Sequence, residues 1–121
     1  MKLKTAGKGA FTLVEIMIVV AIIGLLAAVA IPNYAKARER AYMITCINNL
    51  QQIDGAVQRW SLDMKKDDQQ PVTYSDIRGY LRNAVVCPSG GTRFEDSYTL
   101  TTVDARPACQ RKPTTHMLPQ D

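Results

Sequence analysis

The stretch Phe11–Ile31, FTLVEIMIVVAIIGLLAAVAI, decides the fold of this chain. It is almost entirely apolar, and Glu15 is its single charged residue. As an α-helix, these 21 residues would be roughly 30 Å long, which matches the hydrocarbon core of a bilayer. An ionisable side chain in such a helix is costly to place in lipid and usually has a functional partner. The stretch therefore predicts a membrane-spanning helix with a functional carboxylate near its N-terminal end.

The residues before this stretch, 1–10, predict a basic leader. They contain three lysines and no acid, and so account for most of the net charge of +4. Positive charge directly before an apolar span favours a cytoplasmic N-terminus. Because the remainder of the chain is nearly neutral, its charge gives no reason to expect a nucleic-acid partner.

A cleaved secretory signal peptide is an alternative interpretation of the same region. Its cleavage site would be the small-residue sequence Ala28-Val29-Ala30. Two features favour a retained span instead. The acidic Glu15 stands where signal peptides carry only positive charge, and the apolar run is longer than the usual 7–15 residues of a signal-peptide core.

The helical pattern continues beyond the apolar stretch, over residues 32–64. Pro32 removes one backbone hydrogen bond and is expected to bend the helix rather than end it. After it, apolar residues recur at steps of three or four, which predicts an amphipathic helix with a face that needs cover. That predicted face consists of Met43, Ile47, Leu50, Ile53, Val57, Trp60 and Met64.

Residues 65–121 are expected to form the cover, as a small C-terminal subdomain. A short helix is predicted over Asp76–Leu81, with Thr73 or Ser75 as its cap. The alternation of apolar and polar residues within Phe94–Val103 predicts a half-buried strand.

The rest of this subdomain is predicted to be turns and loops. Pro88-Ser-Gly-Gly91 is a strong turn signal, and the three prolines of residues 104–121 predict extended, loop-like backbone. The predicted fold class is therefore α+β. A long N-terminal helix, spanning the membrane in its first half and amphipathic in its second, packs against a small subdomain with a short antiparallel sheet.

The N-terminal sequence resembles that of the type IV pilin family, which includes the pseudopilins of type II secretion and of competence machinery. The resemblance rests on Gly9-Ala10-Phe11-Thr-Leu-Val-Glu15, the apolar run and Pro32, and it covers about residues 7–34. One departure is Ala10, because the family usually has glycine before the phenylalanine. Alanine is nearly as small, so cleavage after it is still expected.

The resemblance implies a processing and assembly pathway. Prepilin peptidase would cut between Ala10 and Phe11 on the cytoplasmic side and methylate the new amine of Phe11. The subunit would wait in the inner membrane as a single-pass protein with its C-terminal part in the periplasm. An assembly platform and its ATPase would then move it into a homo-oligomeric filament.

Within such a filament, Glu15 is expected to pair with the Phe11 amine of an adjacent subunit and to set the register. The alternative is a carboxylate that only reaches lipid head groups. Gly24 and Pro32 occupy positions at which the family's helix loosens on assembly. The alternative for Gly24 is close packing through small residues.

Three cysteines, Cys46, Cys87 and Cys109, leave one odd thiol if two of them pair. Export would carry the C-terminal part to an oxidising compartment, and pilins often have a bridge near the C-terminus, so a Cys87–Cys109 disulfide is expected. Two inert thiols are the alternative. Cys46 is interpreted as a small buried residue of the helix. Because Cys-x-x-Cys spacing is absent, no zinc site is indicated.

The sequence contains no signature of an enzyme. His116 is the only histidine, and there is no HExxH motif, Gly-rich phosphate loop or serine elbow, so no catalytic residue and no cofactor are expected. Asp96 and Asp104 could line a calcium site, but solvation of two surface acids is the favoured interpretation.

The sequence thus predicts a structural filament subunit. The small C-terminal part and its Cys-Pro-Ser-Gly-Gly turn favour a type II secretion pseudopilus, and a type IV pilus or competence-type pilin is the alternative within the family. An alternative of another class is a monomeric membrane-anchored or secreted binding protein that uses residues 11–31 only as an anchor or signal.

Overall fold

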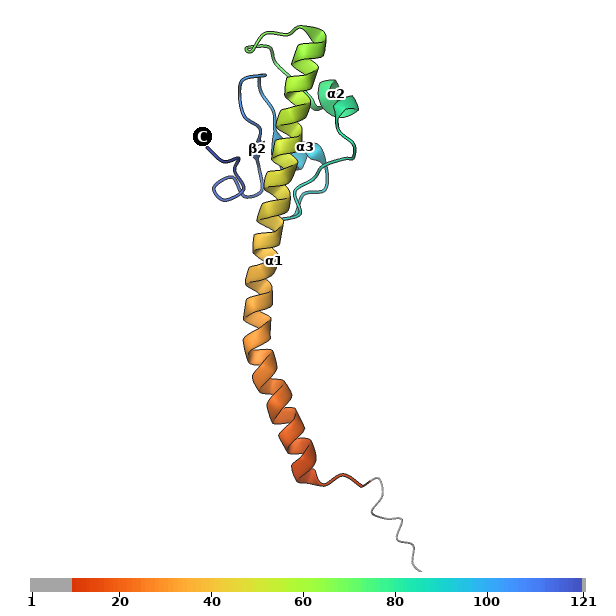
Figure 1. The fold of residues 1–121 in the computed structure, drawn as a ribbon, viewed down its shortest axis with the longest axis vertical. Helices are drawn as coiled ribbons and strands as arrows, with labels where there is room; N and C mark the ends of the chain where they lie inside the picture. Colours follow the sequence, from red (N-terminus) through yellow and green to blue (C-terminus); the bar gives the residue numbers. More distant parts are fainter. Residues whose placement is uncertain (1–9, 121) are drawn as a thin grey trace, which may run out of the picture. The chain divides into compact units, whose positions relative to one another are not determined.

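The computed structural model describes residues 10–120 of the chain. It divides into two compact units, Met1–Arg38 and Glu39–Asp121. One helix, α1 (Leu13–Met64), contributes to both units (Figure 1). The predicted leader, apart from Ala10, lies outside the described residues.

Helix α1 confirms the long N-terminal helix predicted from the sequence. It begins two residues after Phe11 and continues without interruption through Pro32, as predicted. Proline has no N–H and so removes one backbone hydrogen bond. The remaining bonds of this 52-residue helix are enough to keep it continuous.

In the second unit, α1 buries one stripe of side chains at alternating steps of four and three. Members of this stripe are at most 6% exposed, whereas Met64 at the end of the predicted stripe is 56% exposed. Met43 and Ile47 are only partly buried. The buried face therefore lies slightly to one side of the predicted one. Its members are Cys46, Leu50, Ile53, Val57 and Trp60.

A short helix follows α1, as predicted, but with different bounds. It consists of α2 (Tyr74–Ile77) and the 3₁₀ turn η2 (Arg78–Tyr80), and so starts two residues earlier than expected. Thr73 caps it: the Asp76 carboxylate accepts the Thr73 N–H at 2.9 Å and the Thr73 hydroxyl at 2.8 Å. The Asp76 carboxylate thereby satisfies a backbone donor at the helix N-terminus that otherwise has no partner.

The predicted strand over Phe94–Val103 is wrong except at its centre. Phe94–Ser97 forms the helical turn α3, and only β1 (Tyr98–Thr99) is a strand. The reason is local, because the Asp96 carboxylate accepts the N–H of Arg93 at 3.0 Å and thereby favours a helical start. Within the alternating segment, Tyr98 is buried and Thr99 is exposed, as the pattern indicated.

The predicted loop over residues 104–121 contains a strand that the sequence did not indicate. This strand, β2 (Ala108–Cys109), pairs antiparallel with β1 and places Cys109 opposite Tyr98. The short antiparallel sheet of the predicted α+β fold is thus confirmed, with a partner strand drawn from the proline-containing tail. Two residues per strand are too few for stability alone, so the sheet depends on packing against α1.

The core of the second unit lies between α1 and the segments that follow it. Figure 1 shows α2, α3 and β2 gathered around the C-terminal half of α1. Phe94 stacks on Tyr74 with ring centroids 4.3 Å apart, and it contacts Tyr98 at 5.7 Å. The side chains that join the α1 stripe in this core are Ala56, Val72, Ile77, Val85, Cys87, Phe94, Tyr98, Val103 and Cys109.

The predicted turn after Cys87 depends on its two glycines. Gly90 has a φ of 100°, which side-chain-bearing residues rarely adopt. The Gly91 N–H donates to the Cys87 carbonyl at 2.8 Å. A Cβ on Gly91 would lie 2.1 Å from the Ser97 hydroxyl and 2.8 Å from the Cys87 carbonyl oxygen. The turn is therefore packed so closely that only glycine fits at this position.

Candidate functional site

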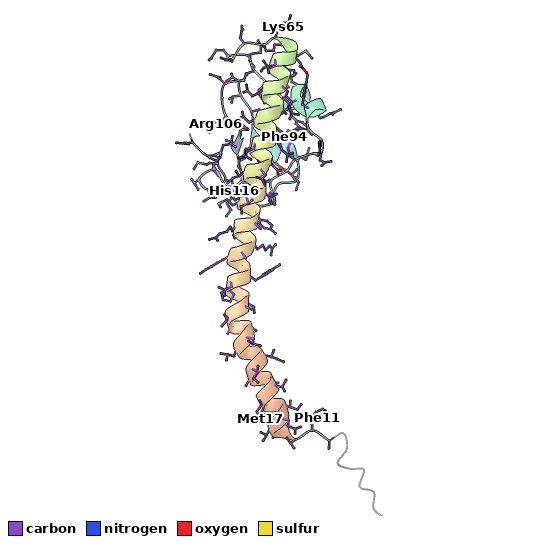
Figure 2. All side chains as sticks on the ribbon, viewed as in Figure 1. Phe11, Met17, Lys65, Phe94, Arg106 and His116 are labelled. Carbon is purple, nitrogen blue, oxygen red and sulfur yellow. The ribbon has the colours of Figure 1, made fainter. Side chains whose placement is uncertain are left out.

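The apolar half of α1 has no cover within the part of the chain that the structure describes. None of its residues from Leu13 to Arg38 is buried. Its large apolar side chains are 49–76% exposed, and Figure 2 shows them projecting around the helix from Met17 upward. One helix among the described residues, α1, is long and apolar enough to cross a membrane. An apolar surface of this extent requires lipid or other protein chains around it.

Glu15 has a hydrogen-bonding partner within its own chain. The Thr12 N–H donates to Glu15 Oε2 at 3.3 Å, and the Glu15 N–H donates to Thr12 Oγ1 at 3.2 Å. These reciprocal bonds form a capping box at the start of α1. The negative carboxylate also lies at the positive end of the helix dipole. Glu15 therefore defines where the helix begins.

Ala10 and Phe11, the predicted cleavage site, lie just before α1. Neither belongs to a helix or strand, and both are exposed, Phe11 to 75% (Figure 2). A protease needs an accessible substrate segment outside helices and strands, and these two residues meet both conditions. Cleavage before Phe11 and methylation of its amine stay predictions.

Gly24 and Pro32, the other two predicted assembly residues, both lie inside α1. A Cβ placed on Gly24 would meet nothing within 4 Å. No feature of the isolated chain therefore requires glycine at this position, and its role in loosening or in close packing stays a prediction.

In the second unit, the structure brings together three cysteines and the histidine. Cys46, Cys87, Cys109 and His116 are each at most 2% exposed. Their sulfur and imidazole nitrogen atoms all lie within 4.8 Å of one another. The Cys87 and Cys109 sulfurs are 3.6 Å apart and both residues are free thiols, so the predicted disulfide stays a prediction.

The sequence interpretation placed Cys46 and His116 apart from the other two cysteines. One signal could have located Cys46: it lies four residues before Leu50 and so continues the stripe that faces the C-terminal segments. No comparable signal exists for His116, because the segment after β2 has no regular periodicity. Burial raises the pKa of the Cys46 and Cys87 thiols and lowers the pKa of His116.

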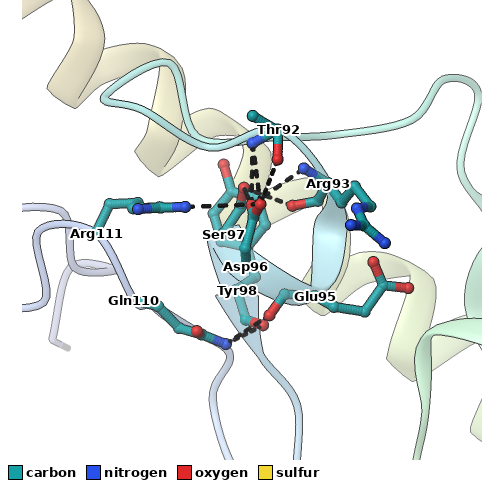
Figure 3. Close-up of polar contacts among 8 residues, drawn as sticks. All are labelled: Thr92, Arg93, Glu95, Asp96, Ser97, Tyr98, Gln110 and Arg111. Carbon is teal, nitrogen blue, oxygen red and sulfur yellow. Dashed lines mark hydrogen bonds and ion pairs between the residues drawn. The ribbon is translucent and has the colours of Figure 1, made fainter.

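Asp96 is held by a separate set of hydrogen-bond donors (Figure 3). Its carboxylate accepts the N–H groups of Thr92 and Arg93, each at 3.0 Å, and the Ser97 hydroxyl at 3.1 Å. Arg111 forms an ion pair with it at 3.6 Å. The Thr92 hydroxyl, together with these N–H donors, holds the pKa of Asp96 well below its usual range.

Asp104, the second acid of the predicted calcium site, has its own donors. Its carboxylate accepts hydrogen bonds from Gln69 at 3.0 Å and from the Thr102 hydroxyl at 2.7 Å. Both acids thus have local structural roles that explain their presence in the loops without a bound ion.

Comparison with known proteins agrees with the features of the N-terminal segment. A family model described as the prokaryotic N-terminal methylation motif matches residues 6–31. The fimbrial protein EcpC of Eikenella corrodens is 34% identical over 113 residues, which cover 91% of this chain and 73% of EcpC. No solved structure matches the chain significantly.

Two further relatives match over shorter lengths. The type IV major fimbrial protein FimA of Dichelobacter nodosus is 45% identical over 67 residues, or 55% of this chain. The type II secretion system core protein G of Klebsiella pneumoniae is 38% identical over 71 residues, or 59% of this chain. The matched regions span 41% of FimA and 49% of core protein G. The chain belongs to the family of type IV pilins and type II secretion pseudopilins, whose members are structural proteins rather than enzymes.

Proposed function

We propose that this chain is a subunit of a helical filament assembled from the inner membrane. The observation that carries the proposal is the first half of α1, whose apolar side chains are exposed on every side. Such a helix suits two successive environments, lipid before assembly and a bundle of like helices afterwards. A monomeric binding protein with a plain anchor would need only the first environment.

Processing by prepilin peptidase would allow this helix to enter the filament. A cut between the exposed residues Ala10 and Phe11 removes the basic leader and creates a positive amine on Phe11. Methylation of this amine keeps its charge. The cut leaves the Thr12–Glu15 capping box intact, because both residues lie on the retained side.

Glu15 would then exchange its partner on assembly. In the isolated chain its carboxylate binds the Thr12 N–H. In a filament, the Phe11 amine of a neighbouring subunit provides a stronger, charged donor. Pairing in a low-dielectric helix bundle mainly sets the register, since an unpaired charge there costs several kcal/mol.

For the kind of filament, we propose a pseudopilus of the type II secretion class. The small C-terminal part and the match to core protein G support this assignment. A surface type IV pilus is the second candidate, which the match to EcpC over 91% of this chain favours. In either case the assembly platform and its ATPase would be the partners that move the subunit out of the membrane.

A single substitution tests the filament proposal. Glu15→Ala should still be inserted into the membrane and processed, but should not enter filaments. Glu95→Ala, which removes an exposed carboxylate from α3, is the matched control and should assemble normally. Sheared filaments and the membrane fraction would be quantified by immunoblot. Normal filament yield from Glu15→Ala would disprove the assigned role.

Two measurements distinguish the alternatives. Mass spectrometry of the mature N-terminus should find methylated Phe11; Ile31 would identify an ordinary signal peptide and an intact Met1 a simple anchor. Deletion of the gene should then abolish protein secretion without loss of surface pili if the filament is a pseudopilus. Loss of surface pili with normal secretion would assign the chain to a pilus instead.

A further inference from the structure

The thiol and imidazole cluster in the second unit has the composition of a structural metal site. It contains Cys46 of α1, Cys87 of the loop before α3, Cys109 of β2 and His116 of the segment after β2. Three thiols and one imidazole form one of the ligand sets that bind structural zinc in proteins. The family model matches residues 6–31 only and does not account for these four residues.

The distances among Cys87, Cys109 and His116 suit tetrahedral coordination, and the Cys46 sulfur lies within 4.8 Å of the other three ligand atoms. Zinc–sulfur bonds of about 2.3 Å and zinc–nitrogen bonds of about 2.0 Å place two sulfurs roughly 3.8 Å apart, and sulfur and nitrogen roughly 3.6 Å apart. The Cys87 and Cys109 sulfurs are 3.6 Å apart. His116 Nδ1 lies 3.8 Å from the Cys87 sulfur and 3.9 Å from that of Cys109. A disulfide would require the two sulfurs to approach to about 2.05 Å.

The Cys109 sulfur also has a hydrogen-bond donor from outside the cluster. The Lys112 N–H donates to it at 3.5 Å. A donor of this kind stabilises a thiolate more than a thiol, as a metal-bound cysteine requires.

A hydrogen-bond network also reaches the loop that carries Cys87. The side-chain N–H of Asn49 donates to the Tyr98 hydroxyl at 3.0 Å. The Asn49 amide also donates to the Val86 carbonyl at 3.1 Å, next to Cys87. This network connects α1 to β1 and to the Cys87 loop, and so fixes the backbone beside that ligand residue.

The surroundings of His116 supply charge balance and a route for an ion. Zinc with three thiolates and one neutral imidazole carries a net charge of −1. His116 lines a surface depression of about 410 Å³ together with the cations Lys112 and Arg40 and the anion Glu39, so the charged residues beside it are positive on balance. The buried cluster is therefore adjacent to solvent on the side of His116.

We propose that Cys46, Cys87, Cys109 and His116 bind one Zn²⁺ ion that holds the C-terminal segments against α1. Binding would deprotonate the three thiols and release three protons to solvent, with no oxidation or reduction. The four ligands come from four segments, so the ion would cross-link the whole small subdomain. It would also use the cysteine that a Cys87–Cys109 disulfide leaves unpaired.

The first test uses the full chain, purified in detergent under reducing conditions without chelator. Elemental analysis should find about one zinc per chain. Replacement by Co²⁺ should give the visible d–d bands of a tetrahedral ion and a thiolate charge-transfer band. An alkylating reagent should modify the three cysteines only after a chelator has removed the metal.

Two ligand variants and a control make the assignment specific. Cys46→Ala and His116→Ala should each reduce bound zinc by more than about tenfold. Met117→Ala, adjacent to His116 but 51% exposed, should bind zinc like the wild type. Chelation should lower the melting temperature of the wild type and of Met117→Ala, but not that of Cys46→Ala.

Either of two results would overturn the proposal. One is a Cys87–Cys109 disulfide in protein isolated without reductant, recognised by a loss of two hydrogen masses and by thiols that only a reductant exposes. The other is the absence of a tetrahedral cobalt spectrum when stoichiometric Co²⁺ is added to the reduced wild-type chain. If a ligand variant fails to fold, the cobalt spectrum of the wild type and the protection of its thiols from alkylation still test whether the metal binds. Because these measurements do not involve filaments, they are independent of the proposed function.

Discussion

The two halves of α1 have the same backbone structure but opposite relations to the rest of the chain. Between Glu15 and Pro32 the helix is apolar on all sides, and none of its described residues up to Arg38 is buried. After Glu39 it is polar on most of its surface and buries one stripe from Cys46 to Trp60. The first half is thus designed for an environment outside the chain, and the second half for the chain's own C-terminal segments.

This difference determines whether a substitution should change folding or change membrane insertion and assembly. A side chain in the second half contributes to the folding of the C-terminal unit, because its contacts are present in the isolated chain. A side chain in the first half contributes to insertion or assembly, because its contacts arise only with lipid or neighbouring subunits. Pairs of equivalent substitutions in the two halves therefore test the comparison directly.

The largest effect is expected from removing a core leucine. Leu50→Ala should lower the free energy of unfolding of the C-terminal unit by about 2–5 kcal/mol, because Leu50 is fully buried. Leu25→Ala, at a position 69% exposed in the first half, should leave it unchanged. The fluorescence of Trp60, the single tryptophan, would follow denaturation of the full chain in detergent. Equal destabilisation by both variants would contradict the division.

A charged substitution should have its large effect in the first half of α1 and little effect in the second half. Ile22→Arg should disfavour membrane insertion by about 2.5–3.5 kcal/mol, because it places a guanidinium within the apolar span. Ile44→Arg is the matched control, since Ile22 is 53% exposed and Ile44 is 50% exposed. Membrane fractionation after carbonate extraction should find only Ile22→Arg displaced. Retention of Ile22→Arg in the membrane would argue against a spanning helix.

A smaller effect is expected at the turn after Cys87. Gly91→Ala should destabilise the C-terminal unit by about 1–3 kcal/mol, because the new Cβ would collide with the Ser97 hydroxyl and the Cys87 backbone. Gly79→Ala, where a Cβ meets nothing within 4 Å, is the control. Thermal melts of both variants would be compared, and an unchanged melt for Gly91→Ala would show that this turn can relax.

The smallest effect concerns acid stability. The folded chain holds the pKa of Asp96 below the value of about 3.9 expected in the unfolded chain. The carboxylate therefore contributes stability above about pH 4, and this contribution is lost as the pH falls further toward the folded-state pKa. Asp96→Asn should destabilise the C-terminal unit at pH 7. It should also make the melting temperature of this unit depend less on pH below about pH 4. Glu95→Gln, one residue away, should keep the wild-type profile.

The sequence predicted the parts of this fold that depend on periodicity or on local chemistry. The apolar run predicted the first half of α1, and the stripe through Leu50 and Trp60 predicted most of the buried face. Of the two candidate caps, Thr73 and Ser75, the structure has Thr73. The predicted strand over Phe94–Val103 failed because capping by Asp96 outweighed an alternating pattern.

The features that the sequence could not predict depend on tertiary contacts. Strand β2 has only two residues, and β1 defines it by pairing. The cluster around Cys87 brings together residues as far apart in sequence as Cys46 and His116, so no short sequence motif indicates it. The Glu15 contact with Thr12 was equally missed, although threonine three residues before glutamate is the sequence signature of a capping box.

The Thr12–Glu15 capping box has a consequence for the energetics of polymerisation. Because the carboxylate already has donors in the free subunit, a new intermolecular pair yields only the difference between two sets of bonds. The contact therefore discriminates between correct and incorrect neighbours more strongly than it drives growth. If Glu15 pairs with the Phe11 amine as proposed, a filament of this chain would return subunits to the membrane more readily than one whose carboxylate had no donors in the free subunit.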